Sequence, residues 1–185
     1  MAEYKGILIC GELAGEKLSG VTAELLNTGR KLSDELNQPL SLLLVGKNIN
    51  GAANEAIPLG ADKVYVADTP LLKDYQTDAY LAVMDKVAKQ VNPHIIVTGQ
   101  TSVGRDLIPR LAFRLDTAAI TDCVGLEIDS GSKELLLTKP VYGGNAQATF
   151  TSESYPQIAT VRAKAMSPLE RDESRQGEVI TIEAS

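Results

Sequence analysis

The chain has 185 residues, a formal net charge of −6 and only 4% aromatic residues, with no tryptophan. This length favours one domain with an aliphatic core large enough to need no disulfide or metal. The negative charge argues against nucleic acid or an anionic membrane as the main partner, and the few aromatic side chains argue against a base-stacking surface. No apolar run is long enough for a membrane span or a signal peptide, so we expect a cytoplasmic protein.

The side chains that usually build metal or nucleophilic sites are isolated in this sequence. Cys10 and Cys123 end or flank apolar runs without C-x-x-C spacing, and His94 is the one histidine. We therefore predict two buried free thiols and no metal centre. A single histidine cannot complete a Ser/His/Asp or Cys/His set, so we expect no catalytic residues and a protein that is not an enzyme.

The first two-thirds of the chain alternate short apolar runs with segments of helical periodicity. Near-continuous apolar strands separated by helices predict a mostly parallel sheet with helices on both faces, an α/β fold. Gly60 is expected to cap one helix in the left-handed conformation, and Thr77 to cap the next helix at its start. The predicted strands are 7–10, 40–45, 63–67, 95–98 and 118–121, and the predicted helices are 21–37, 51–59, 77–91 and 107–115.

After Asp122 the pattern changes. Residues 126–137 read as a hairpin around Asp129–Gly131, and further strands are expected at 147–151 and 157–162. These strands predict antiparallel C-terminal additions to the parallel core. The charged, turn-rich segment 167–177 reads as a linker, and 178–183 as a strand that needs an edge to pair with. We thus divide the chain into a domain, 1–166, and a linker with a terminal strand, 167–185.

The loop after the predicted strand 95–98 is the first candidate site. Gly104, Arg105 and Asp106 lie where a strand passes into a helix, a position that can bind an anion or a nucleotide. Helix-start geometry explains the same residues, with Asp106 as the N-cap and Pro109 in the first turn. The spacing matches neither G-x-G-x-x-G nor a P-loop, which favours the capping interpretation. A mononucleotide site near Gly11–Gly15 is a further possibility, with a simple connection preferred.

Other residues are candidates for contact with a partner. Arg110 is an outward-facing basic side chain of the predicted helix 107–115, and Arg105 lies in the loop just before that helix. Arg162 could pair with a carboxylate or could simply be a solvated strand end. Gly143, Gly144 and Asn145 form a tight turn in which glycine and asparagine can adopt positive φ. Two adjacent glycines also let another backbone approach closely, so this turn is either a plain hairpin connection or part of an interface.

Several sequence words occur together in one order. They are GADKVYV at 60–66, GRDLIPRLA at 104–112, AITDC at 119–123, KPVYGGNA at 139–146 and PQIATVR at 156–162. In these words, and along essentially the whole chain, the sequence resembles the N-terminal domain of the alpha subunit of electron transfer flavoproteins. The resemblance implies a Rossmann-like fold similar to that of the adenine-nucleotide hydrolases.

The resemblance also implies a function. Such a subunit pairs with a beta subunit in a heterodimer whose FAD carries electrons from dehydrogenases, such as the acyl-CoA dehydrogenases of fatty acid β-oxidation, to a quinone-linked oxidoreductase or another acceptor. A C-terminal domain holds most of the FAD, and the N-terminal domain serves as a scaffold.

The chain departs from the family pattern at its C-terminal part. It ends before the flavin domain, and Ala163-Lys164 replaces the usual Pro-Gly after Arg162. We therefore expect no FAD on this chain alone, whether it is an isolated domain or a naturally short homologue. The alternative function is a stand-alone module for AMP, ATP or NAD. Whether the carrier bifurcates electrons stays open.

Overall fold

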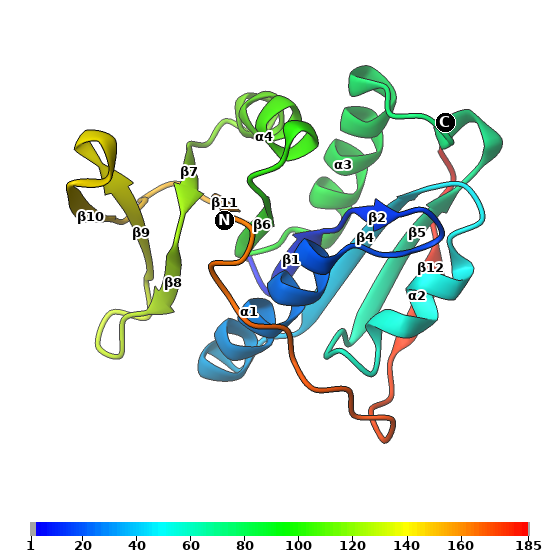
Figure 1. Cartoon of the computed structure of the whole chain (residues 1–185), viewed down its shortest axis with the longest axis horizontal. Helices are drawn as coiled ribbons and strands as arrows, with labels where there is room; N and C mark the ends of the chain where they lie inside the picture. Colours follow the sequence, from blue (N-terminus) through cyan, green and yellow to red (C-terminus); the bar gives the residue numbers. More distant parts are fainter. Residues whose placement is uncertain (1–2, 185) are drawn as a thin grey trace.

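A computed structural model of the chain describes residues 3–184. Its centre is a seven-stranded sheet in which every pairing is parallel, with the strand order β12-β5-β4-β1-β6-β11-β7 (Figure 1). The strands are β1 (Ile7–Cys10), β4 (Leu40–Gly46), β5 (Lys63–Asp68), β6 (Ile95–Gly99), β7 (Ala119–Cys123), β11 (Gln157–Val161) and β12 (Glu178–Thr181). This confirms the α/β, Rossmann-like prediction.

Helices cover both faces of this sheet, as the apolar strands predicted. On one face, buried leucines and alanines of two helices form a continuous cluster with the sheet. On the other face, a second cluster joins the sheet to the other two helices. The first pair is α1 (Gly20–Leu36) and α2 (Asn50–Ala56), and the second is α3 (Thr77–Val91) and α4 (Ser102–Arg114).

At three helix ends the capping residue differs from the prediction. Helix α2 ends at Ala56, so Gly60, with a φ of 110°, lies in the turn beyond the helix. The N-cap position of α3 is Gln76, because the hydroxyl of Thr77 donates to Asp106 instead of capping. Helix α4 starts at Ser102 with Thr101 as its cap, so Asp106 is not the N-cap and Pro109 lies inside the helix. These three capping predictions were wrong.

The C-terminal strands are only partly antiparallel. The expected hairpin and the turn at 142–145 join β8 (Gly125–Ile128), β9 (Leu135–Val141) and β10 (Ala146–Phe150) in a three-stranded antiparallel sheet, with the short 3-10 helix η2 (Tyr142–Gly144) in the turn. In contrast, β11 inserts between β6 and β7, and β12 pairs with the edge of β5, both in parallel. The prediction of antiparallel additions was therefore wrong for β11, whereas β12 pairs with a strand edge, as expected for the terminal strand.

The antiparallel sheet lies at one end of the molecule, away from α3 and β12 (Figure 1). One of its faces packs on the body, because Leu126, Ile128, Leu135 and Leu137 join the cluster that includes α1. A small ribbon, β2 (Leu13–Ala14) paired with β3 (Lys17–Leu18), interrupts the connection between β1 and α1. The segment between β11 and β12 runs past α1, where the amide of Asn27 donates to the carbonyl of Ser167.

Candidate functional site

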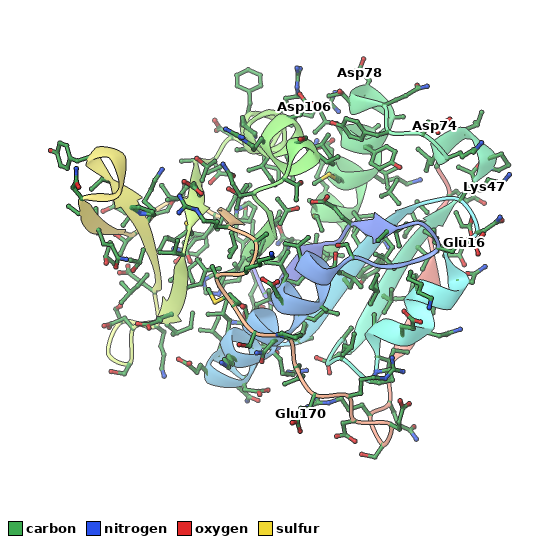
Figure 2. All side chains as sticks on the ribbon, in the orientation of Figure 1. Glu16, Lys47, Asp74, Asp78, Asp106 and Glu170 are labelled. Atoms are coloured by element: carbon green, nitrogen blue, oxygen red, sulfur yellow. The ribbon has the colours of Figure 1, made fainter. Side chains whose placement is uncertain are left out.

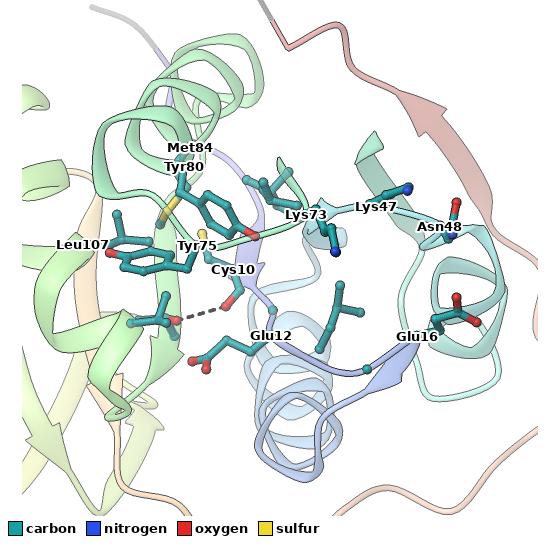
Figure 3. A pocket seen from close by; sticks show the side chains of 18 residues that line it. Cys10, Glu12, Glu16, Lys47, Asn48, Lys73, Tyr75, Tyr80, Met84 and Leu107 are labelled. Carbon is teal, nitrogen blue, oxygen red and sulfur yellow. Dashed lines mark hydrogen bonds between the residues drawn. The ribbon is translucent and has the colours of Figure 1, made fainter. Parts of the chain in front are cut away.

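The strand order creates a crevice beside β1. The chain builds β4 and β5 on one side of β1 and then crosses to place β6 on the other side. The loops at the carboxyl ends of β1 and β6 therefore diverge, and open α/β sheets bind their ligands in such a crevice. A cavity of about 520 Å³ lies there, bordered by the loops after β1, β4 and β5 and by helices α3 and α4 (Figure 3).

Two tyrosines form an aromatic wall of this pocket. The rings of Tyr75 and Tyr80 meet edge to face, with centroids 5.1 Å apart. The hydroxyl of Tyr80 donates to the carbonyl of Leu72 at 2.9 Å, and the hydroxyl of Tyr75 donates to Asp106. Burial raises the pKa of both phenols, and the hydrogen bond to Asp106 raises that of Tyr75 further. Both rings are thus neutral at physiological pH and held in place.

Glu12 occupies the space in front of the start of α4. The hydroxyl of Thr101 donates to Oε1 of Glu12 at 2.6 Å and accepts from the backbone N–H of Gly104 at 3.0 Å. Burial raises the pKa of Glu12, and the hydrogen bond from Thr101 partly offsets that rise. A helix start usually attracts an external anion. Here the chain's own carboxylate lies at that place.

The three loop residues singled out from the sequence have different surroundings, and none of them lines the pocket. A Cβ on Gly104 would lie 2.0 Å from the carbonyl oxygen of Gly99, so this glycine lets α4 pass close over the end of β6. Arg105 is exposed. The carboxylate of Asp106 accepts from Tyr75, Thr77 and Arg110, which lowers its pKa.

A second polar group lies at the carboxyl ends of β7 and β11. Arg162 donates to both oxygens of Asp122, at 3.0 and 2.8 Å, and this pairing lowers the pKa of Asp122. Lys139 and Arg105 are close enough to lower that pKa further. The structure thus confirms that Arg162 has a carboxylate partner, Asp122.

The remaining predicted contact residues lie elsewhere. Arg110 is exposed on α4 and forms an ion pair with Asp106, one turn earlier in the same helix. Gly143, Gly144 and Asn145 are exposed in the turn between β9 and β10, at the end of the antiparallel sheet (Figure 1). The six residues therefore do not form one surface.

The loop 11–15, one of the candidate sites from the sequence, lines the pocket, but the residues of the other loops around it were not predicted. Lys47 and Asn48 directly follow β4, and Lys73 and Tyr75 lie between β5 and α3. Their position after strands of a parallel sheet is a usable signal, because such loops gather at one edge. Glu16 and Lys47 both lie at this edge and line the pocket (Figure 2).

The isolated cysteines and histidine remain apart in space. Cys10 and Cys123 are buried and free, and burial raises the pKa of their thiols to about 12 and about 11. Within residues 3–184, no three Cys, His, Asp or Glu side chains come together as a metal site. In the same residues, no helix combines the length and apolar character needed to cross a bilayer.

Comparison with known proteins agrees with this fold and with the sequence words. Residues 7–185 match the family described as "Electron transfer flavoprotein domain". The chain belongs to the electron transfer flavoprotein family. It is similar to the electron transfer flavoprotein subunit alpha of Thermoanaerobacterium thermosaccharolyticum, with 41% identity over all of this chain and 56% of that protein.

Two further relatives extend the comparison. The electron transfer flavoprotein subunit alpha of Megasphaera elsdenii is 39% identical over all of this chain and 55% of its own length. The acryloyl-CoA reductase electron transfer subunit beta of Anaerotignum propionicum is 35% identical over 90% of this chain and 52% of its own length. The chain spans about half the length of the curated relatives it matches, and it corresponds to the N-terminal domain of the alpha subunit.

Proposed function

We propose that this domain is the scaffold part of a cytoplasmic electron carrier, in which it pairs with a beta subunit and supports the transfer of electrons from dehydrogenases to an acceptor. The observation that supports this most directly is the match of residues 7–185 to the electron transfer flavoprotein domain. The names of the relatives agree, since each is called a subunit and all contain the words "electron transfer".

The antiparallel sheet is our candidate for the contact with the beta subunit. Four of the five residues of β10 are exposed, and the turn before it exposes Tyr142 to 84%. A sheet that buries one face on its own domain and leaves an aromatic side chain and an open edge in solvent is suited to binding another chain. Gly143, Gly144 and Asn145 belong to this surface. We assign Arg162, directly after β11, and Arg105, near the start of α4, to the margin of this surface.

FAD in the intact carrier would be held mainly by another domain. A dinucleotide cradle needs a glycine-rich turn and a helix start that is open to the pyrophosphate. In this domain the start of α4 faces the carboxylate of Glu12, and the first strand leads into the β2–β3 ribbon instead of a glycine turn. The described residues therefore do not fit the pyrophosphate of FAD, and the domain contributes structure rather than a redox step.

Co-purification with the beta subunit of the same organism tests the contact. We expect the native domain to elute with the beta subunit, and the double variant Tyr142→Ser/Phe150→Ser to bind it more weakly. Phe113→Ser is the matched control, because Phe113 is 87% exposed but lies on α4, outside the antiparallel sheet. Equal binding by all three proteins would place the contact elsewhere, and no binding by the native domain would contradict the proposed function.

A further inference from the structure

The antiparallel sheet has two edges with different surroundings. Strand β10 forms the outer edge and is mostly exposed, whereas β8 forms the inner edge, between β9 and α1 (Figure 1). A cavity of about 600 Å³ lies along this inner edge. Every residue of 124–128 lines it, although successive side chains of a strand point to opposite faces. The backbone edge of β8 therefore borders the cavity.

The register of the hairpin identifies the backbone groups of β8 that face the cavity. The N–H of Asp129 donates to the carbonyl of Glu134 at 2.9 Å, and antiparallel pairs alternate between bonded and non-bonded ones. Glu127, two residues earlier, therefore directs its backbone groups to β9. The N–H and C=O groups of Leu126 and Ile128 point the other way. Both residues are buried, yet no strand within 3–184 pairs with this edge, and buried backbone groups normally have a partner.

Two further walls turn this edge into a groove. One wall is the face of α1 that carries Thr28, Lys31 and Glu35, and the other is the segment 165–167. This segment is held against α1, because the amide of Asn27 donates to the carbonyl of Ser167 at 2.7 Å. A helix beside a sheet edge usually covers it. Here the cavity separates α1 from β8, so the edge stays open to an extended chain.

The groove has an apolar part and a charged part. Leu32 and Met166 line it together with the leucine and isoleucine of β8, and all belong to one apolar cluster. Lys31, Glu35 and Glu127 form the charged part, and none of the three has an ion-pair partner among the described residues. One lysine against two carboxylates leaves a net negative charge, which favours a basic side chain on the occupant.

We propose that this groove binds an extended segment of the beta subunit, which adds to β8 as a further strand. The backbone of the segment pairs with Leu126 and Ile128. Because side chains alternate along a strand, the segment presents an apolar residue to Leu32 and a basic residue to Glu127. Strand addition of this kind takes its affinity from main-chain hydrogen bonds and its specificity from alternate side chains.

The choice of the beta subunit as occupant rests on the proposed function, in which that subunit contacts the outer part of the same sheet. The sheet has three strands, so its two edges are separated by roughly 10 Å, two strand spacings. A partner chain bound at β10 needs only a short extended segment to reach β8. Strand β8 has four residues, and a segment of about that length would cover it.

Amide hydrogen exchange of the domain, alone and with the beta subunit of the same organism, tests the strand addition. In the free domain we expect fast exchange at Leu126 and Ile128, because their N–H groups have no strand partner. Glu127 should exchange slowly, because its N–H faces β9, and it is the internal control. In the complex, Leu126 and Ile128 should slow by roughly tenfold or more, with little change at Glu127.

A charge reversal tests the basic residue of the segment. Glu127→Lys should weaken binding of the beta subunit roughly two- to fivefold in titration calorimetry, since it replaces an attraction with a repulsion. Glu134→Lys is the matched control, because Glu134 is exposed in the same hairpin but does not line the groove. Equal affinities of both variants would contradict the basic residue.

The exchange measurement separates this inference from the proposed function. If the beta subunit binds but Leu126 and Ile128 keep their fast exchange, strand addition is overturned and the contact at β10 stands. If these amides become protected in the free domain as its concentration rises, a second copy occupies the edge and the proposed occupant is overturned. If the beta subunit does not bind at all, both the proposed function and this inference fail.

Discussion

The parallel sheet and the antiparallel sheet bury their strands in different ways. Every residue of β6 and of β11 is buried, whereas four of the five residues of β10 are exposed. The parallel strands have helices on both faces, while the antiparallel strands pack on the body with one face only. The comparison indicates that stability resides in the parallel sheet, and that the antiparallel sheet keeps a surface available for a partner.

The largest expected effect comes from breaking the core of the parallel sheet. Ile96 of β6 is fully buried, so Ile96→Ala should lower the free energy of unfolding by about 2–5 kcal/mol. Tyr142→Ser, in the exposed turn of the antiparallel sheet, should change it by less than about 0.5 kcal/mol. Urea unfolding of both variants measures the difference. Equal losses would show that the two sheets share one source of stability.

The next effect concerns how closely α4 packs over β6. Gly104→Ala places a methyl group 2.0 Å from the carbonyl oxygen of Gly99 and should cost about 1–3 kcal/mol. Gly51→Ala is the matched control, because Gly51 is also helical but its Cβ would have no neighbour within 4 Å. This control should gain about 0.5–1 kcal/mol. A tolerated Gly104→Ala, measured by thermal unfolding, would contradict the close approach.

A smaller effect should depend on pH. The hydrogen bonds from Tyr75 and Thr77 lower the pKa of Asp106 in the folded chain. Their stabilisation is therefore complete above the unfolded pKa of about 4 and is lost as the pH falls through the lower folded pKa. Asp106→Asn should be less stable than the native chain at pH 7, and the difference between their free energies of unfolding should become smaller at acidic pH. Urea unfolding midpoints of both proteins between acidic pH and pH 7 measure this. A difference in midpoint that does not change with pH would contradict the interpretation.

The smallest effect has the opposite sign. Burial raises the pKa of Glu12, because it disfavours the ionised carboxylate. The cost to the stability of the folded chain is therefore greatest at neutral pH, where this group is ionised. Its contribution to stability is complete below the unfolded pKa of about 4.3 and declines as the pH rises through the folded pKa. Glu12→Gln should therefore be slightly more stable than the native chain at pH 7, with no advantage near pH 4. Melting temperatures at both pH values distinguish this from a purely structural loss.

Much of the fold could be predicted because it depends on local pattern. The strands at 40–45 and 95–98 are buried on both faces, and their apolar runs predict this burial from the local sequence alone. The direction of β11 relative to its neighbours could not be predicted from the local sequence. Periodicity says that 157–161 is a strand, but the parallel insertion of β11 between β6 and β7 depends on which edges remain open.

The candidate site was harder to predict, because long-range contacts compete with local ones. Thr101 and Asp106 both have side chains that can cap a helix start. In the structure Thr101 is the N-cap of α4. The carboxylate of Asp106 instead accepts hydrogen bonds from Tyr75 and Thr77, which are distant in sequence. The pocket residues Lys47, Lys73 and Tyr75 carry no shared motif. They meet only because the loops after neighbouring parallel strands emerge at one edge.

The sequence by itself determined the elements, the parallel character of the core and the family, because side-chain periodicity and characteristic words are local properties. Only the tertiary structure decided the strand order, the start of α4 at Ser102, the placement of Glu12 at that helix start and the pocket beside β1. Each of these depends on groups that are far apart in the chain and become neighbours when the sheet assembles.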